Sequence, residues 1–324
     1  MKKLILLTAL LLVFASCRYK ELCYDHQHQT EYNLSLVLHL QLDLDVELDV
    51  SEEAHTKIEM PEYMKVCFYD PLSGALTQTA MVGPEGGLIQ IAPGKYNMVI
   101  YSFGTEWTWI RGEHHIDSLE AYTSDITAIK TRQLLQFTQD GKYDAPGPII
   151  YTPDHLIVAR QEIEVQPYSL TPQVDTIAVR AATVVETYGF EVTNIAGIEY
   201  IASVDAFVTN QARSTFFGRG EKNPSPATVY FPLEVDREKG ILKTTFNTFG
   251  KLPGESLSYL HILLTDTKGN VITVTEDITE QFENSDRIIE IEDPIDIPKP
   301  DEEGGGIDPT VEDWEEENID IPIG

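Results

Sequence analysis

Residues 34–50 read LSLVLHLQLDLDVELDV, and apolar and polar side chains alternate along almost the whole run. The apolar side of this alternation consists of leucine and valine only, at Leu34, Leu36, Leu38, Leu40, Leu42, Leu44, Val46, Leu48 and Val50. A period of two places these side chains on one face of an extended strand and the polar ones on the other. At about 3.3 Å per residue the run would span roughly 55 Å, so we expect it to bend or bulge. The run therefore predicts a long β-strand with one buried face.

Four carboxylates share the polar face of this run, at Asp43, Asp45, Glu47 and Asp49. Side chains on one face of a strand are spaced about 7 Å apart, which is too far for neighbours to enclose a small hard cation. The solvated face of a sheet explains them better than a metal site.

Further short β-rich runs follow, separated by glycine and proline turns. In the first half, residues 64–69, 88–92 and 95–103 are predicted strands. The second half contains eight more, at 156–166, 176–185, 188–192, 202–209, 228–233, 241–249, 257–265 and 270–278. Residues 266–270 (DTKGN) predict a hairpin turn, in which Gly269 supplies the positive φ. This pattern predicts an all-β protein built of sandwiches rather than a parallel sheet with crossover helices.

The chain begins with a short basic region, an apolar run to Phe14, and Ala15-Ser16-Cys17. This is the pattern of a secretory signal over residues 1–16, with Cys17 in the position of an acylated lipobox cysteine. Plain signal-peptidase cleavage near an ordinary cysteine is the alternative. Arg18 and Lys20 favour the outer membrane over the inner one. We expect a lipid-anchored protein of the outer membrane, exposed at the cell surface.

The expected organisation is a lipid-linked tether at 17–30, β-sandwiches at 31–166 and 167–291, and an acidic linker with a possible donor strand at 292–324. The whole chain carries 23 basic and 53 acidic residues, a net charge of −30. Such a charge repels phosphate backbones, so nucleic acid is not an expected partner. Residues 292–324 contain 13 acidic residues and one lysine, which is the composition of a tail.

No catalytic motif is found in the sequence: it has no nucleophile elbow, phosphate loop, dinucleotide fingerprint or His-Glu-x-x-His. Cys23, His26 and His28 resemble soft-metal ligands but lack a fourth partner, so no metal and no cofactor are predicted. Cys23 and Cys67 either form one disulfide or leave Cys67 as a buried free thiol. We expect a protein that is not an enzyme.

Trp107 and Trp109 are two residues apart and would share one face of a strand, with Phe103 nearby. Packing in the core is the ordinary interpretation of such aromatic residues. The alternative is that they form an exposed surface on which sugar rings stack.

Several motifs in order resemble one known group. They are ELCYDH at 21–26, MKVCFY at 64–69, GLIQIAPGKY at 87–96, TFNTFG at 245–250, LLTD at 263–266 and EDITEQF at 276–282. Together they resemble the fimbrillin-associated anchor and minor-subunit lipoproteins of Bacteroidales, over most of residues 21–282. The resemblance implies two tandem transthyretin-like Greek-key β-sandwiches with a C-terminal extension. It also implies a pilus anchor or accessory subunit whose partners are fimbrial subunits, joined by strand addition. Polymerising pilins of this kind have an arginine-protease site that we do not find here, which fits an uncleaved anchor.

The candidate donor strand lies in the last eighteen residues, where apolar side chains return at Ile307, Val311, Trp314, Ile319, Ile321 and Ile323. An unstructured acidic tail is the alternative for this segment. The alternative for the whole protein is a stand-alone surface adhesin or glycan-binding lipoprotein.

Overall fold

A computed structural model describes residues 35–44, 58–127, 147–166, 175–252, 257–283, 287–291 and 293–300. These residues form β-strands joined by turns and three short 3-10 helices, η1 (Ile116–Ser118), η2 (Ile198–Tyr200) and η3 (Gln281–Glu283). None of them forms a helix with the length and hydrophobicity that a membrane crossing requires. The predicted all-β fold is confirmed; the transthyretin-like arrangement stays a prediction.

The first group of strands forms a seven-stranded sheet in the order β3-β2-β5-β9-β10-β1-β4. Its strands are β1 (Ser35–Leu42), β2 (Met64–Tyr69), β3 (Leu76–Val82), β4 (Gly86–Gln90), β5 (Gly94–Ser102), β9 (Ile157–Val165) and β10 (Asp175–Thr183). β3 and β4 are consecutive strands at opposite ends of this order, yet a bridge between Gly83 and Gly86 joins them. The sheet therefore curls until its two ends meet around a core.

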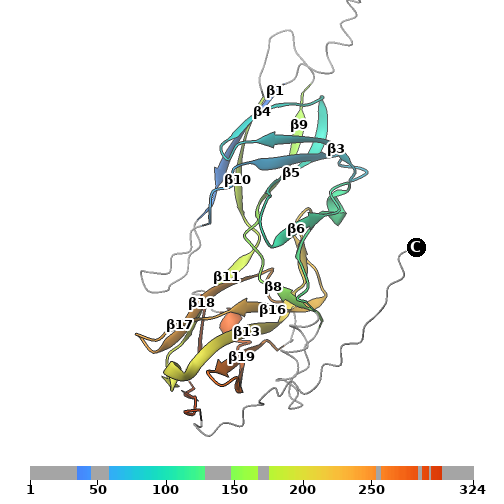
Figure 1. The fold of residues 1–324 in the computed structure, drawn as a ribbon. Coiled ribbons are helices and arrows are strands. Elements are labelled where there is room, and N and C mark those ends of the chain that lie inside the picture. The colour runs from blue at the N-terminus through green and yellow to red at the C-terminus, as the bar shows by residue number, and fades with distance from the viewer. Residues whose placement is uncertain are drawn as a thin grey trace, which may run out of the picture.

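Strand β1 follows the alternation that the sequence predicts. Leu36, Leu38 and Leu40 are buried in that core, whereas His39 and Gln41 are exposed. β1 pairs in parallel with β10 and antiparallel with β4 (Figure 1). The predicted continuation through residues 45–50 lies outside the described residues.

Strand β2 is buried on both faces, which explains its unbroken apolar sequence. Val66 and Phe68 face the core of the curled sheet, while Cys67 and Tyr69 face a second core on its outer side. A four-stranded sheet in the order β15-β14-β7-β6 covers that second core. Its strands are β6 (Thr108–Arg111), β7 (Glu120–Thr123), β14 (Ser214–Phe216) and β15 (Glu221–Lys222).

The second group of strands packs two sheets face to face, with a separate pair of short strands beside them. The five-stranded sheet, β20-β19-β13-β16-β8, contains β8 (Ile149–Tyr151), β13 (Ile201–Ala212), β16 (Pro226–Pro232), β19 (Tyr259–Asp266) and β20 (Val271–Asp277). The four-stranded sheet, β17-β18-β11-β21, contains β11 (Glu186–Val192), β17 (Glu234–Asp236), β18 (Ile241–Thr248) and β21 (Ile288–Ile291). The short pair is β12 (Ile195–Ala196) with β22 (Ile295–Asp296).

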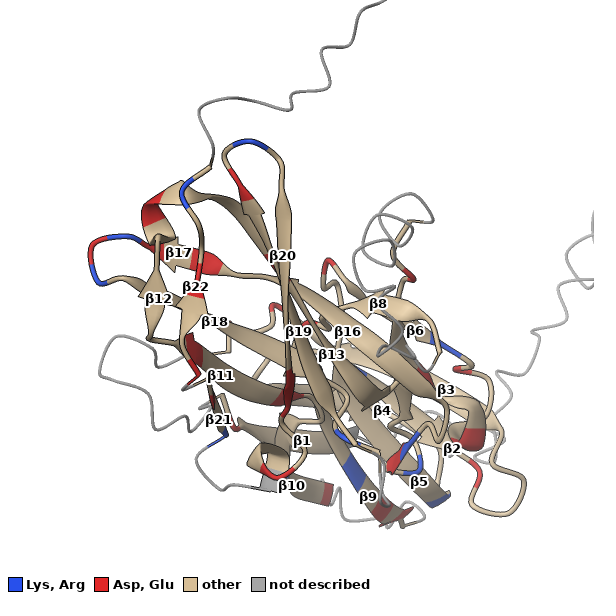
Figure 2. Ribbon diagram, turned by 90° about the horizontal axis from the view of Figure 1, so that it is seen from below, with Lys and Arg blue, Asp and Glu red and all other residues tan. Residues whose placement is uncertain are grey.

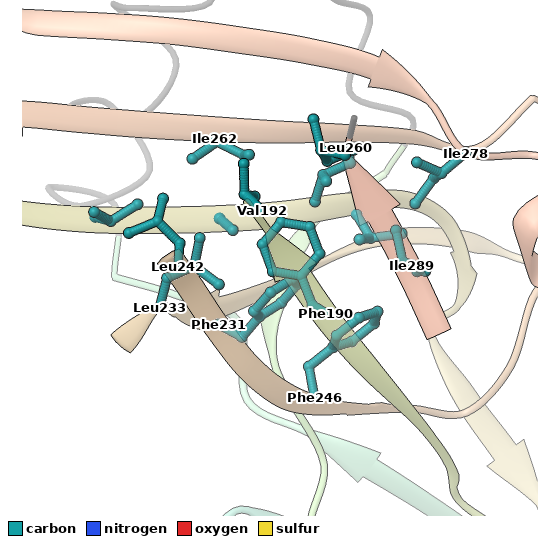
Figure 3. Packing of buried hydrophobic residues seen from close by; sticks show 14 of the residues in the cluster. Phe190, Val192, Phe231, Leu233, Leu242, Phe246, Leu260, Ile262, Ile278 and Ile289 are labelled. Atoms are coloured by element: carbon teal, nitrogen blue, oxygen red, sulfur yellow. The ribbon is translucent and has the colours of Figure 1, made fainter. Parts of the chain in front are cut away.

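An aromatic cluster fills the space between these two sheets (Figure 3). The rings of Phe231 and Phe246 stack with centroids 4.2 Å apart, and Phe190 meets Phe231 edge-on. The predicted turn at 266–270 is confirmed, since Asp266 accepts hydrogen bonds from the backbone N–H groups of Lys268 and Asn270 and Gly269 has a φ of 87°.

Strands cross between the two groups in both directions. β10 follows the expected boundary at 166/167 but pairs in the seven-stranded sheet, whereas β8 precedes that boundary but pairs with β16. β14 likewise comes from the second half of the chain and pairs with β7 of the first. The division into residues 31–166 and 167–291 stays a prediction, and these exchanges show that the two halves share strands.

The close contact between β4 and β1 in the seven-stranded sheet depends on a glycine, Gly86. Gly86 has a φ of +100°, and a Cβ added there would lie 2.0 Å from the carbonyl oxygen of Leu38 in β1. Gly104 has a similar φ of +83° but nothing within 4 Å of an added Cβ. We expect Gly104→Ala to cost about 1–2 kcal/mol from backbone strain alone. Gly86→Ala should cost about 1–3 kcal/mol more because its methyl group pushes β1 away from β4.

Urea unfolding of the two variants measures this difference. Equal destabilisation by Gly86→Ala and Gly104→Ala would contradict the close contact between β4 and β1.

Candidate functional site

Only some of the predicted site residues lie in the part of the chain that the structure describes. Cys17, the cluster of Cys23, His26 and His28, and the six apolar tail residues from Ile307 to Ile323 lie outside it, and their roles stay predictions. Within the described residues, no cluster of three or more metal-ligating side chains is found.

Cys67 is a buried free thiol. Its Sγ lies 3.9 Å from the hydroxyl of Tyr101, and burial raises the pKa of the thiol. Because the reactive form of cysteine is the thiolate, this group is held in its unreactive form. Cys67 therefore belongs to the packing between β2 and the four-stranded sheet.

Trp107 and Trp109 both lie at the surface, with 40% and 52% of their area exposed. The interpretation that they pack in the core is wrong. Trp107 lies just before β6, where its ring packs against Tyr151 at a centroid distance of 4.9 Å. The backbone N–H of Trp107 donates a hydrogen bond to the carboxylate of Asp154. Trp109 lies within β6. The two indoles thus have different surroundings.

Trp109 belongs to a small aromatic and basic surface on the outer face of β6 and β7. The register places Trp109 directly opposite Tyr122, so the two side chains project from the same face. Arg111, two residues further along β6, shares that face, and its guanidinium carbon lies 4.5 Å from the centroid of the Tyr122 ring. We call the surface formed by Trp109, Arg111 and Tyr122 the Trp109 platform.

A buried carboxylate holds the arginine of this platform in place. Arg111 Nε donates to Glu120 Oε2 at 2.6 Å, and the Glu120 side chain is 6% exposed. The other oxygen, Oε1, accepts hydrogen bonds from the Ser214 hydroxyl and from Asn223. Burial alone would raise the pKa of the Glu120 carboxyl, but the hydrogen bonds from Arg111 and Ser214 outweigh it and lower that pKa.

Glu120 also joins the two halves of the chain. Its partner Ser214 is the first residue of β14, which pairs with β7, and its partner Asn223 directly follows β15. Other hydrogen bonds also join the two halves: the Thr152 hydroxyl donates to the backbone carbonyl of Asn247, and the side-chain amide of Asn247 donates to the backbone carbonyl of Pro153. The platform therefore stands on a sheet built of strands from both halves of the chain.

A second surface is a groove of about 610 Å³ at one end of the seven-stranded sheet. It lies between the segment that enters β2, the loop after β5 and the segment that enters β9. Its lining includes the exposed apolar side chains of Met60, Tyr63 and Phe103. Its carboxylates are Glu59, Glu62, Glu106 and Asp154, and none of the described residues that line it is a lysine or an arginine. This groove favours cationic or hydroxyl-bearing ligands over anions.

Sequence reasoning missed Arg111, Glu120 and Tyr122. Arg111 could have been found, because it stands two residues after Trp109 and a strand brings such residues to one face. Tyr122 and Glu120 could not, because their place beside β6 depends on the register of the β6–β7 pair.

The model of one protein family, described as "Domain of unknown function (DUF5119)", matches residues 16–232, which is more than half of the chain. A curated relative from Bacteroides ovatus, named "Putative fimbrium anchoring subunit Fim4B", is 24% identical over 307 residues. The similarity covers 82% of this chain and 86% of the relative. The resemblance to fimbrial anchor proteins noted in the sequence is confirmed.

The chain is also similar to solved structures. A crystal structure described as "a putative adhesin from Bacteroides ovatus ATCC 8483" has a TM-score of 0.59 at 22% identity and covers 86% of this chain and 96% of that one. The fimbrial anchor protein Mfa2 from Porphyromonas gingivalis has a TM-score of 0.43 at 15% identity, over 76% of this chain and 83% of that one. The first likeness supports the fold; the second is too low to carry an argument.

The buried carboxylate of the platform gives a testable expectation for stability. Glu120→Gln removes the charge opposite Arg111 while it keeps the shape of the side chain, and we expect a cost of about 1–2 kcal/mol. The matched control is Glu221→Gln, which breaks the ion pair with Arg219 at a carboxylate that is 62% exposed. That change should cost less than about 0.5 kcal/mol, as exposed pairs do.

The pH dependence of the same variants has a definite sign. Since the pKa of Glu120 is lowered in the folded protein, its carboxylate stabilises the fold above its unfolded pKa. That contribution is lost as the pH falls through the folded pKa. Denaturant unfolding at several pH values should show the gap between the wild type and Glu120→Gln shrinking in acid; a gap that widens contradicts the network.

Proposed function

This chain belongs to the DUF5119 family, and we propose that it is a cell-surface anchor or accessory subunit of a fimbria. The observation that carries the proposal is the similarity to a relative named as a fimbrium anchoring subunit, which extends over most of both chains. Fimbrial subunits are the proposed partners. The chain acts by binding and holding them, and it catalyses no reaction.

The architecture suits a subunit that bears load. The pairs β7 with β14 and β8 with β16 join strands from the two halves of the chain by backbone hydrogen bonds. Thr152 and Asn247 add a side-chain tie at the same junction. Pulling on one end of such a molecule loads several backbone pairs at once, instead of a single flexible linker.

The proposed attachment is through the N-terminus. Residues 1–16 would be removed as a signal, Cys17 would be acylated, and residues 17–30 would tether the first sheet to the outer membrane. A single acyl chain gives weak binding, so stable attachment requires more than one chain on this cysteine.

The proposed contact with the next subunit is strand addition by residues 307–323. An extended segment with apolar side chains at intervals can complete the open edge of a partner's sheet, where main-chain hydrogen bonds give affinity and pockets give specificity. Ile319, Ile321 and Ile323 have the spacing of two that such a strand requires.

The tail can be tested by deletion. We expect a chain that lacks residues 307–324 to be exported normally but to lose co-purification with fimbrial subunits from the same cells. The control replaces Asp308, Glu312 and Asp320 by Asn, Gln and Asn, which keeps the apolar positions and should keep the partner. Unchanged co-purification after the deletion would remove the donor-strand proposal.

The lipid anchor can be tested by labelling. We expect cells grown with an alkyne-tagged palmitate to label the wild-type chain and the Cys23→Ser variant, but not Cys17→Ala. The unlabelled variant should leave the outer-membrane fraction. Labelling of Cys17→Ala would contradict acylation at this residue.

A further inference from the structure

We propose that the Trp109 platform binds an uncharged pyranose ring, stacked on Trp109 and hydrogen-bonded through its oxygen atoms to Arg111. The proposal goes beyond fimbrial anchoring and stands on the geometry of this surface alone. It assigns to β6 and β7 a carbohydrate site that lies on the outer side of the four-stranded sheet.

The apolar half of the site is an indole that the fold leaves open. Trp109 is 52% exposed. On the inner side of the same sheet, Ala121 and the neighbouring Leu119 are fully buried in the second core. An indole fixed on a strand offers a flat face at little cost in conformational entropy, and such exposed aromatic surface marks binding sites. The axial C–H groups of a pyranose form a matching apolar face.

The polar half of the site is a guanidinium held in one orientation. Glu120 binds Arg111 at Nε, and the Tyr122 ring lies against the guanidinium plane. No protein acceptor is found among the described residues for the two terminal nitrogens of Arg111, whose side chain is 57% exposed. Arginine only donates hydrogen bonds, so the ligand has to supply acceptor oxygens. Because its orientation is set in advance, less entropy is lost on binding.

Glu120 itself does not contact the ligand in this arrangement. Both of its oxygens are occupied, one by Arg111 and the other by Ser214 and Asn223. We therefore assign Glu120 as a positioning residue, which acts on the ligand only through the guanidinium.

Charge and size select the class of ligand. The Arg111–Glu120 pair is neutral as a unit, and the chain as a whole carries a net charge of −30, so hydroxyl oxygens fit better than a carboxylate or a phosphate. Acidic segments are spread over both groups of sheets (Figure 2). A protein partner would need about 800 Å² on each side, far more than one indole and one partly exposed tyrosine present. One or two sugar rings match the surface.

The neighbouring tryptophan provides a matched control. Trp107 is also exposed and only two residues away, but its ring is engaged by Tyr151 and it lies outside β6. The sequence alone would treat the two indoles alike, whereas the structure assigns the sugar to Trp109 only.

The test is a glycan array of neutral and acidic oligosaccharides, probed with the mature chain without its signal. We expect binding to at least one neutral pyranose oligosaccharide, followed by calorimetric titration with that oligosaccharide. Trp109→Ala should weaken the affinity at least about tenfold, and Arg111→Lys should weaken it several-fold because the planar fork is lost. Trp107→Ala should leave the affinity within about twofold of the wild type.

A spectroscopic readout locates the sugar independently of affinity. Ligand should change the tryptophan emission of the wild type and of Trp107→Ala, but not that of Trp109→Ala. Glu120→Gln should keep the emission change while it weakens binding, as a positioning residue requires. Thermal unfolding of each variant checks that the fold is intact, and the exposed position of Trp109 makes its replacement mild.

Several outcomes would overturn the proposal. These are binding to no oligosaccharide, binding to acidic sugars only, equal loss with Trp107→Ala and Trp109→Ala, or binding confined to anionic lipid vesicles. None of these outcomes bears on the fimbrial role, because that role is measured by co-purification of the tail variants.

Discussion

The double pairing of β1 is the constraint on which the first half of the fold depends. β1 lies between β4, which is antiparallel to it, and β10, which is parallel to it and stands more than a hundred residues further along the chain. Parallel neighbours need a crossover, and here everything from β2 to β9 forms that connection. The sheet around β1 is complete only when β4 and β10 are both paired with it. The curled sheet is therefore a cooperative unit rather than a series of hairpins.

The same sheet also explains why the two halves of the molecule are not independent. Its outer side is apolar at Cys67, Tyr69 and Tyr101, and this surface has to be covered. The cover is the four-stranded sheet, whose β14 and β15 come from the second half and bring Phe217 against Tyr101. Burial of an apolar face thus recruits a hairpin from across the chain, and the carboxylate of Glu120 is enclosed at the resulting joint. A joint made of core packing and backbone pairs transmits force better than a linker does.

The sequence alone was sufficient to predict individual strands and turns. It was not sufficient to predict which distant strands pair with one another. Alternation in β1, the apolar run of β2, most strands of the second half and the Asp266–Asn270 turn were all predicted, because each follows from the period or the turn chemistry of a few neighbouring residues. The place of β10 was not predicted, since Pro167 and Pro172 before it indicated a boundary between domains. β10 pairs with β1, more than a hundred residues earlier, and no local sequence pattern encodes the partner or the register of such a pair. Trp109 was singled out from its residue type, yet its surroundings depend on β7 and β14.

The balance of charge on the Trp109 platform explains how a strongly acidic protein can keep an open binding surface. Arg111, Arg213, Arg219 and Lys222 gather on the strands and turns of the four-stranded sheet, and each pairs with one carboxylate. Each of these pairs is neutral as a unit, in a chain of net charge −30. At physiological ionic strength charges more than about 8 Å apart are largely screened, so a ligand at this surface senses mainly the neutral pairs. The groove beside β2 has the opposite character, because its described lining contains four carboxylates and neither lysine nor arginine. Two surfaces on one acidic scaffold can therefore select ligands of different charge, and the difference arises from where the few basic residues are placed.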